Sequence, residues 1–272
     1  SCANMDRYSG GSRSVGDQKP TYRMGRRLVP VDWIFSEDQL KDSPSRRVGM
    51  SEKDELVLRR KGIKLILAIG HQLGLKVNPT SGTACVYFHR FYMLHSFNDF
   101  DWPLTALSCL FLAGKAEETP KKCRDICNLA NKSHSELFTQ CRNLIEDVMS
   151  MERVLLQTVK FDLQVDHPYK YLLDYANKLN NCHPKEVITE MVRCAWTLVN
   201  DSYATTLCLL WEPQIVAVSL FYLAIKLKEK DEINESRWWE EYVAELSVDK
   251  MDSICHAILD YYTAMKETEN AV

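Results

Sequence analysis

Two charged residues lie on apolar helical stripes, where they could take part in protein recognition. Lys115 follows Phe111 and Leu112 by four and three residues, so a helix places all three on one face. Glu152 follows Val148 by four residues on a second apolar stripe. An isolated charge in an apolar site must be paired or reach water. Two interpretations stay open: the charges lie at the rim of a core with their heads in solvent, or they flank an exposed patch and present a charge pair to another protein.

Cysteine and histidine could instead hold a metal ion. Cys123 and Cys127 come shortly before His134. Their spacing differs from C-x2-C and no second pair follows, which favours buried thiols over a zinc site. Most of the ten cysteines fall inside apolar helical runs, a usage typical of a reducing compartment rather than of a disulfide framework. We expect neither a metal nor a cofactor.

Motifs of catalysis are missing from the sequence. It holds no phosphate-binding loop, no dinucleotide-binding fingerprint, no H-E-x-x-H and no G-x-S-x-G. His89 and His95 fall on an apolar helix, where core or rim histidines with satisfied hydrogen bonds are the ordinary interpretation. We therefore expect no catalytic residue and no enzymatic activity of the chain's own.

Composition narrows the class of protein further. The chain has 272 residues, of which 46% are hydrophobic and 26% charged, an ordinary globular balance. Its net charge of −3 argues against a nucleic-acid binder that works by bulk electrostatics. No apolar run approaches the roughly 18 residues of a membrane span, and the N-terminus lacks the apolar core of a signal peptide. Residues 1–30 are basic and weakly hydrophobic, which predicts a flexible arm.

The elements that must position the two charges are helices. From residue 51 onward the hydrophobic spacing is helical almost throughout, and no alternation typical of strands appears. Ser51 and Asp54 resemble a capping box before a helix that ends near Gly74. Four more helices are expected up to about Lys160. A second series is expected at residues 168–179, 185–201, 213–228, 237–246 and 248–265. The sequence predicts an all-α fold.

The chain also repeats itself at an offset of 111 residues. LTALSCLFLAGK, from residue 104, aligns with IVAVSLFYLAIK, from residue 215, and Lys115 matches Lys226. This repeat predicts two tandem five-helix domains at 51–163 and 164–265, each with its third helix at the centre. A short N-terminal helix and linker would fill residues 31–50, with Trp33, Ile34 and Phe35 in a helix packed back on the domains. Residues 266–272 would form a tail.

Several stretches together resemble the cyclin family. They are HRFYM at 89–93, FLAGKAEETPKK at 111–122, MERVLLQTVKFDL at 151–163, HPYKYLL at 167–173 and RWWEEYV at 237–243. Within the family the chain is similar to the transcriptional cyclins, with the K type nearest and the T type next. The resemblance covers roughly residues 30–265 and implies two tandem cyclin boxes.

The resemblance implies a partner and a surface. Cyclins bind a cyclin-dependent kinase through helices three and five of the first box and hold the kinase's αC helix inward. The family's conserved lysine and glutamate match Lys115 and Glu152. Matching neighbours in the kinase-binding surface are Leu112, Ala116, Glu118 and Phe161. The second box does not grip αC in this family, so Lys226 is interpreted as a long side chain that reaches water.

The resemblance also implies a role. The kinase would phosphorylate the repetitive C-terminal tail of the largest subunit of RNA polymerase II, in support of elongation and RNA processing in the nucleus. The chain would be its non-catalytic activator in a heterodimer. An alternative is a scaffold of cyclin boxes that binds other proteins or nucleic acid without activating a kinase. A nucleic-acid scaffold would need a basic face and often a zinc ribbon, and both the net charge and the missing ribbon argue against it.

Overall fold

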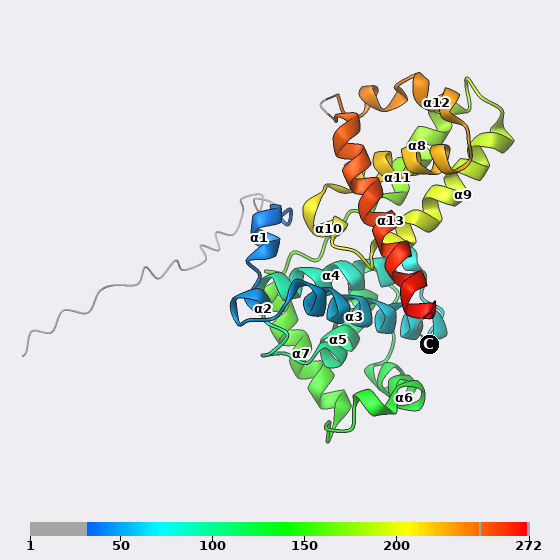
Figure 1. The fold of residues 1–272 in the computed structure, drawn as a ribbon. Coiled ribbons are helices and arrows are strands. Elements are labelled where there is room, and N and C mark those ends of the chain that lie inside the picture. The colour runs from blue at the N-terminus through cyan, green and yellow to red at the C-terminus, as the bar shows by residue number, and fades with distance from the viewer. Residues whose placement is uncertain (1–31, 245, 271–272) are drawn as a thin grey trace, which may run out of the picture. The chain divides into compact units, whose positions relative to one another are not determined.

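The computed structural model describes residues 32–244 and 246–270, which belong to one compact unit. The predicted basic arm at residues 1–30 lies outside them. The described residues form helices and turns with no strand, so the all-α prediction is confirmed (Figure 1). None of the helices in this part of the chain combines the length and hydropathy needed to span a bilayer.

The chain enters through a non-helical segment followed by two short helices, α1 (Glu37–Lys41) and α2 (Pro44–Arg47). The helix predicted across Trp33–Phe35 is wrong, because the capping box of Ser36 and Gln39 starts α1 only after it. The aromatic residues nevertheless pack back on the molecule. Trp33 is buried and its Nε1 donates to Asp162 Oδ2 at 3.1 Å, while the Phe35 amide donates to the carbonyl of Leu209 at 2.7 Å.

The first bundle is built around one apolar helix, α5. It comprises α3 (Glu52–Gln72), α4 (Gly82–Leu94), α5 (Trp102–Ala116), α6 (Cys123–Ser133) and α7 (Leu144–Thr158), with short helical turns at Val77–Ser81 and Ser135–Leu137. Helix α5 packs against each of the other four, and ten of its fifteen residues are buried. The predicted central position of the third helix is therefore confirmed, because a helix that is apolar all round must be surrounded.

The second bundle repeats this plan around α11. It comprises α8 (Tyr169–Leu179), α9 (Lys185–Ser202), α10 (Leu207–Leu210), α11 (Pro213–Leu227), α12 (Asp231–Glu235), a 3-10 turn at Trp238–Glu241 and α13 (Val248–Asn270). Helix α11 packs against α8, α9 and α13. The helix predicted over 237–246 is wrong, because Arg237 adopts a left-handed φ of 50° and only the short turn follows. Helix α13 runs on to Asn270, through most of the expected tail.

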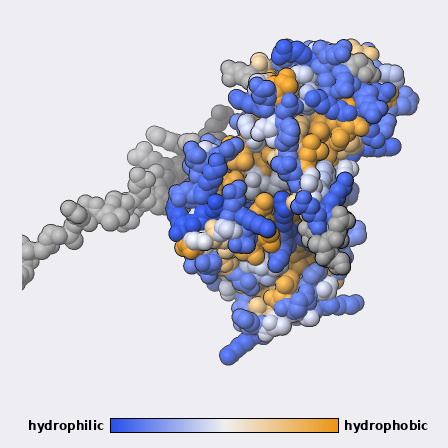
Figure 2. Space-filling model, viewed as in Figure 1, coloured by the Kyte–Doolittle hydropathy of each residue, from blue (hydrophilic) through white to orange (hydrophobic). Residues whose placement is uncertain are grey.

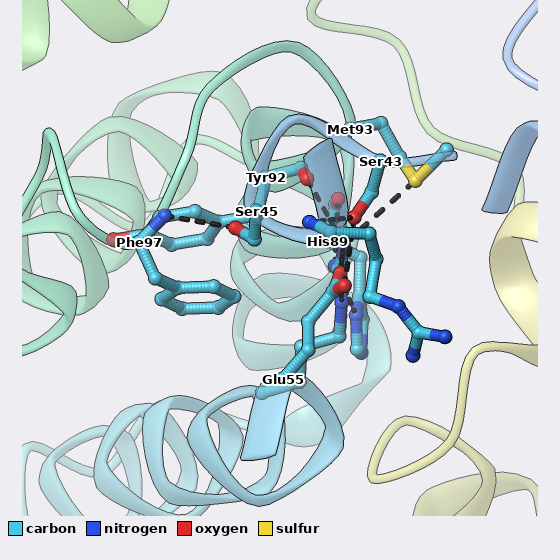
Figure 3. A network of polar contacts seen from close by, with 9 residues as sticks. Ser43, Ser45, Glu55, His89, Tyr92, Met93 and Phe97 are labelled. Atoms are coloured by element: carbon cyan, nitrogen blue, oxygen red, sulfur yellow. Dashed lines mark hydrogen bonds and ion pairs between the residues drawn. The ribbon is translucent and has the colours of Figure 1, made fainter. Parts of the chain in front are cut away.

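A buried polar network ties α2, α3 and α4 together (Figure 3). Arg59, with 1% of its side chain exposed, forms an ion pair with Glu55 at 2.7 Å and donates to the backbone carbonyls of His89 and Tyr92. Ser43, which caps α2, donates to the other oxygen of Glu55 at 2.7 Å. Burial of a charge is costly unless it is paired and hydrogen-bonded, and here both charges are. The network fixes how α2, α3 and α4 pack against one another.

A second chain of buried hydrogen bonds links the two bundles. His167, in the connection between them, contacts the hydroxyl of Thr83 on α4 through Nε2 at 2.8 Å and that of Tyr203 through Nδ1 at 2.7 Å. His89 Nε2 lies 2.8 Å from the carbonyl of Tyr203. Burial lowers the pKa of His167 to about 4, so the imidazole is neutral at pH 7 and can be both donor and acceptor.

Hydrophilic residues cover much of the face shown in Figure 2, and the hydrophobic residues exposed on that face form separate patches.

Candidate functional site

Lys115 and Glu152 meet where α5 packs against α7. Lys115 Nζ forms an ion pair with Glu152 Oε1, and the ammonium also lies 4.3 Å from the centre of the Phe111 ring. Spacing along α5 explains the second contact, because residues i and i+4 share a helix face. The structure therefore pairs the lysine with the glutamate, and contact of this pair with another protein stays a prediction.

The two members of the pair differ in exposure. The side chain of Lys115 is 44% exposed and that of Glu152 only 12%. A carboxylate so deeply covered needs a cation, and no other cation of the described residues lies within ion-pair distance of it. Glu152 therefore holds Lys115 in place, and the lysine head with the adjoining ring is what the surface presents.

The end of α5 determines where the flanking residues lie. Glu118 adopts a left-handed φ of 55°, its amide bonds to the carbonyl of Lys115, and the amide of Thr119 bonds to the carbonyl of Gly114 at 2.8 Å. This pair of bonds is a Schellman motif, which ends a helix by turning the chain back on itself. The chain can approach α5 closely because a Cβ on Gly114 would lie only 3.3 Å from the Thr119 carbonyl oxygen. Glu118 projects into solvent as a result.

The end of α7 exposes an aromatic ring. Lys160 and Phe161 both adopt left-handed φ angles, 56° and 57°, and the Phe161 amide bonds to the carbonyl of Leu156 at 3.0 Å. Such angles are unfavourable for residues with a Cβ, and two in succession are uncommon. Phe161 is 59% exposed, although a phenyl ring gains free energy from burial. An exposed ring held by a strained backbone is a candidate for contact with another protein.

Two of the predicted neighbours are less exposed than a contact surface requires. Leu112 is only 2% exposed, because α5 is central and its apolar stripe points inward, so Leu112 supports the surface from beneath. Ala116 is half-buried. The structure therefore brings Lys115 and Glu152 into contact and leaves Glu118 and Phe161 exposed at the ends of the two helices that carry them. Which of these residues meet a partner stays a prediction.

Lys226, which matches Lys115 in the 111-residue repeat, also has surroundings similar to those of Lys115. Lys226 Nζ lies 4.6 Å from the centre of the Tyr222 ring and 3.9 Å from Asp252 Oδ1 on α13. The expectation of a side chain that only reaches water is therefore wrong: Lys226 is also framed by an aromatic ring and an acid. The aromatic neighbour could have been found from the sequence, since Phe111 matches Tyr222 at the same offset of 111. The difference lies in the acid, because Asp252 is 41% exposed whereas Glu152 is 12% exposed.

The cysteines near this site are thiols packed in the bundle. Cys123 Sγ lies 3.8 Å from Cys127 Sγ, and burial raises the pKa of Cys127 to about 12. His134 Nδ1 contacts the hydroxyl of its neighbour Ser133. Within residues 32–244 and 246–270, no three His, Cys, Asp or Glu side chains are grouped as a metal site would need.

Residues 18–164 match the family model of the cyclin N-terminal domain. The chain belongs to the cyclin family. It is similar to human cyclin-K, with 46% identity over 244 residues that cover 86% of this chain and 41% of that protein. Cyclin-K of Danio rerio is 44% identical, over 86% of this chain and 56% of its own length. Cyclin-T of Drosophila melanogaster is 34% identical, over 85% and 21%. The chain thus spans about half or less of the length of these relatives.

Solved structures support the fold of this cyclin. A chain of the yeast TFIIK (Kin28/Ccl1/Tfb3) complex superposes with a TM-score of 0.64 at 21% identity, covering 83% of this chain and 94% of that one. A chain of the yeast RNA polymerase II CTD kinase CTDK-1 complex gives a TM-score of 0.66 at 18% identity, covering 85% and 73%. These likenesses support the all-α fold of the chain.

Proposed function

We propose that this cyclin is the activating subunit of a transcriptional cyclin-dependent kinase in the nucleus, and that it has no catalytic activity of its own. Similarity to cyclin-K over 86% of the chain supports the K-type role. The kinase would phosphorylate the C-terminal tail of RNA polymerase II in support of elongation and RNA processing. The likeness to a chain of the yeast CTD kinase complex fits this substrate.

The proposed kinase-binding surface is formed by α5 and α7. The observation that carries the proposal is the pairing of Lys115 with the covered carboxylate of Glu152 beside exposed Glu118 and Phe161. A fixed cation gives orientation and partner discrimination, while an aromatic ring supplies affinity. Such a surface can hold a kinase helix at its polar end and along its apolar side.

Charge reversal tests the surface. Lys115→Glu places a second carboxylate beside Glu152, so we expect loss of kinase capture together with some loss of stability. The double variant Lys115→Glu, Glu152→Lys restores an ion pair inside the protein but reverses the charge offered to the kinase. We expect it to regain stability in thermal unfolding and still to fail in capture. Lys226→Glu on the second bundle is the matched control and should capture kinase normally.

The measurement begins with affinity purification from nuclear extract and mass spectrometry of the bound kinase. The identified kinase is then reconstituted with each variant, and phosphorylation of a peptide of RNA polymerase II tail repeats is measured. Full activation by the folded double variant would refute the proposed surface. Recovery of no kinase with the unaltered chain would refute the proposed function.

A further inference from the structure

Arg90, a half-buried residue on α4, carries two buried guanidinium nitrogens without a partner. Its Nε and Nη1 are both buried and make no hydrogen bond, and no carboxylate of the described residues lies within ion-pair distance of it. The ring of Trp33 lies 4.9 Å from the guanidinium carbon. A stacked ring covers the face of a guanidinium but leaves the N–H groups at its edges unsatisfied. Buried N–H groups normally have a partner, so this arginine calls for one.

The acids nearby are already engaged. Asp166 accepts both of its 2.7 Å contacts from Lys170 Nζ, and Asp162 accepts a hydrogen bond from Trp33 Nε1. The other titratable neighbours are neutral, since burial lowers the pKa of His167 to about 4 and raises that of the Cys208 thiol to about 11. Asp162 lies close enough to favour the charged form of Arg90 electrostatically, but no carboxylate hydrogen-bonds to Nε or Nη1 of the guanidinium.

Arg90 lines a cavity between the two bundles. The cavity measures about 80 Å³, room for roughly five to eight waters at about 10–15 Å³ each. Its other walls are mainly apolar, with Ile34, Val86 and Trp211 among them. Asp166 also lines the cavity, but both of its oxygens accept from Lys170 Nζ, which neutralises its charge. The hydroxyls of Ser202 and Tyr203 also line it, but Ser202 donates to the carbonyl of Val199 and Tyr203 bonds to His167. Arg90 is thus the one wall residue with charged donors to spare.

We propose that this cavity is a binding site for a carboxylate on a short apolar stem, with Arg90 as the group that pairs with it. A carboxylate matches the planar fork of a guanidinium, and a stem of two or three carbons fits the apolar walls. A phosphate fits poorly, because its three or more oxygens need several donors and the cavity offers one arginine. The carboxylate can belong to a free small acid or to a glutamate side chain in a partner peptide.

Thermal unfolding of the full chain tests the site. The probes are sodium propionate and the capped peptide acetyl-Val-Glu-Val-amide, each compared with sodium chloride at equal ionic strength. At ten times its Kd a ligand raises the folded-to-unfolded ratio about 11-fold, which for a chain of this size is a rise of roughly 3 to 6 °C in Tm. We expect this rise for the unaltered chain with one or both probes, and that result also identifies the source of the carboxylate.

Variants assign the effect to the cavity. Arg90→Met should abolish the rise. Arg60→Met is the matched control. Arg60 is also partly buried, stacks on Tyr261 at 5.3 Å and has a buried, unpartnered Nε, but it lies outside the cavity. The Arg60→Met variant should therefore keep the rise in Tm. Ile34→Trp retains Arg90 but fills the cavity from a half-buried position, and it should also abolish the rise if Arg90→Met fails to fold.

Three results would overturn the proposal. The first is no rise with either probe. The second is an equal rise in all variants, which would mean that the acids bind elsewhere. The third is a larger rise with inorganic phosphate than with propionate that depends on Arg90, which would contradict the class of ligand. None of these readouts involves the kinase, so the site and the proposed function succeed or fail separately.

Discussion

At the scale of single residues, the proposed kinase surface depends on an unequal pair. Glu152 is covered by α5 and α7 and cannot be reached by much of a partner, whereas Lys115 is 44% exposed. A surface lysine usually loses side-chain entropy when it is held in place. Here the glutamate and the ring of Phe111 have already restricted it, so a partner that binds Lys115 pays little further ordering cost.

Phe161 gives the residue-scale prediction for affinity. Because its ring is 59% exposed, Phe161→Ala removes little packing from the cyclin itself, and its Tm should be nearly unchanged. We expect kinase affinity to fall about 5- to 30-fold, the equivalent of about 1 to 2 kcal/mol for an aromatic interface residue. Calorimetric titration with the reconstituted kinase measures it. Leu227→Ala, at a 50% exposed position of the second bundle, is the control and should leave affinity unchanged.

His167 gives a prediction for pH. Its folded-state pKa of about 4 lies below the ordinary value of about 6.5, so between these pH values the unfolded chain binds a proton that the folded chain does not. Its contribution to stability is complete above about pH 6.5 and is lost as the pH falls toward 4. His167→Gln should reduce the slope of unfolding free energy by up to about 1.4 kcal/mol per pH unit in this window.

Urea unfolding at a series of pH values measures that slope. Some dependence should remain in the variant, because burial also lowers the pKa of His89 to about 3. A substitution of the exposed His256 by glutamine is the control. An unaltered slope in the His167 variant would contradict a neutral, buried imidazole at the link between the bundles.

At the scale of elements, the helices could be predicted from periodicity and their ends only partly. The apolar stripes identified α5 and α11 as central helices, because few polar residues interrupt them. The Ser51 cap could also be predicted from the local sequence, because a single side chain satisfies a free backbone amide at the start of the helix. The left-handed residues Glu118 and Arg237 could not be predicted, since neither is glycine and the tertiary structure imposes their angles.

The proposed site was predictable in the same limited way. Hydrophobic spacing placed Lys115 and Glu152 on apolar stripes, and the resemblance to cyclins matched both residues to the family's kinase-binding lysine and glutamate. Their direct contact depends on how α5 crosses α7, which no local pattern states. The burial of Leu112 and the framing of Lys226 by Asp252 also follow from packing between helices rather than from spacing along one.

Matched helix ends in the two bundles give the element-scale prediction. Glu229 after α11 has the same φ of 55° as Glu118 after α5, and its Schellman bonds repeat at the offset of 111 residues. Glycine adopts this conformation without a Cβ penalty. Glu118→Gly and Glu229→Gly should each stabilise the protein by about 1 kcal/mol in urea unfolding.

The variants Glu118→Gly and Glu229→Gly together distinguish an effect on the stability of the cyclin from an effect on kinase binding. Only Glu118 lies beside the proposed kinase surface, so only Glu118→Gly should weaken kinase capture despite its gain in stability. Equal capture by the two variants would remove Glu118 from the surface. Destabilisation by both would show that other contacts of these glutamates outweigh the strain of the left-handed angle.

At the scale of the whole molecule, the bundles are joined by buried polar bonds as well as by apolar contact. Tyr203 is central to the join: its hydroxyl bonds to His167 and its carbonyl to His89, while Tyr87 donates to the carbonyl of Leu163 at 2.6 Å. If the bundles moved apart without water entering, each of these polar groups would lose its hydrogen-bond partner while it remained buried. Such bonds make the orientation of the bundles specific, and two of the residues that form them, His167 and Tyr203, also line the cavity at Arg90.

The join predicts that the two bundles unfold together. Tryptophans are present in both, at positions 33 and 102 in the first half and 196, 211, 238 and 239 in the second. Fluorescence and far-ultraviolet circular dichroism should therefore give coincident urea transitions, as two-state unfolding requires. Tyr203→Phe removes only the hydroxyl and leaves His167 Nδ1 without its partner, so the unfolding free energy should fall by about 1 to 3 kcal/mol in a single transition. Tyr203→Ala also creates a cavity and should separate the transitions of the two bundles. Two separate transitions in the unaltered chain would mean that the buried bonds between the bundles are too weak to couple them.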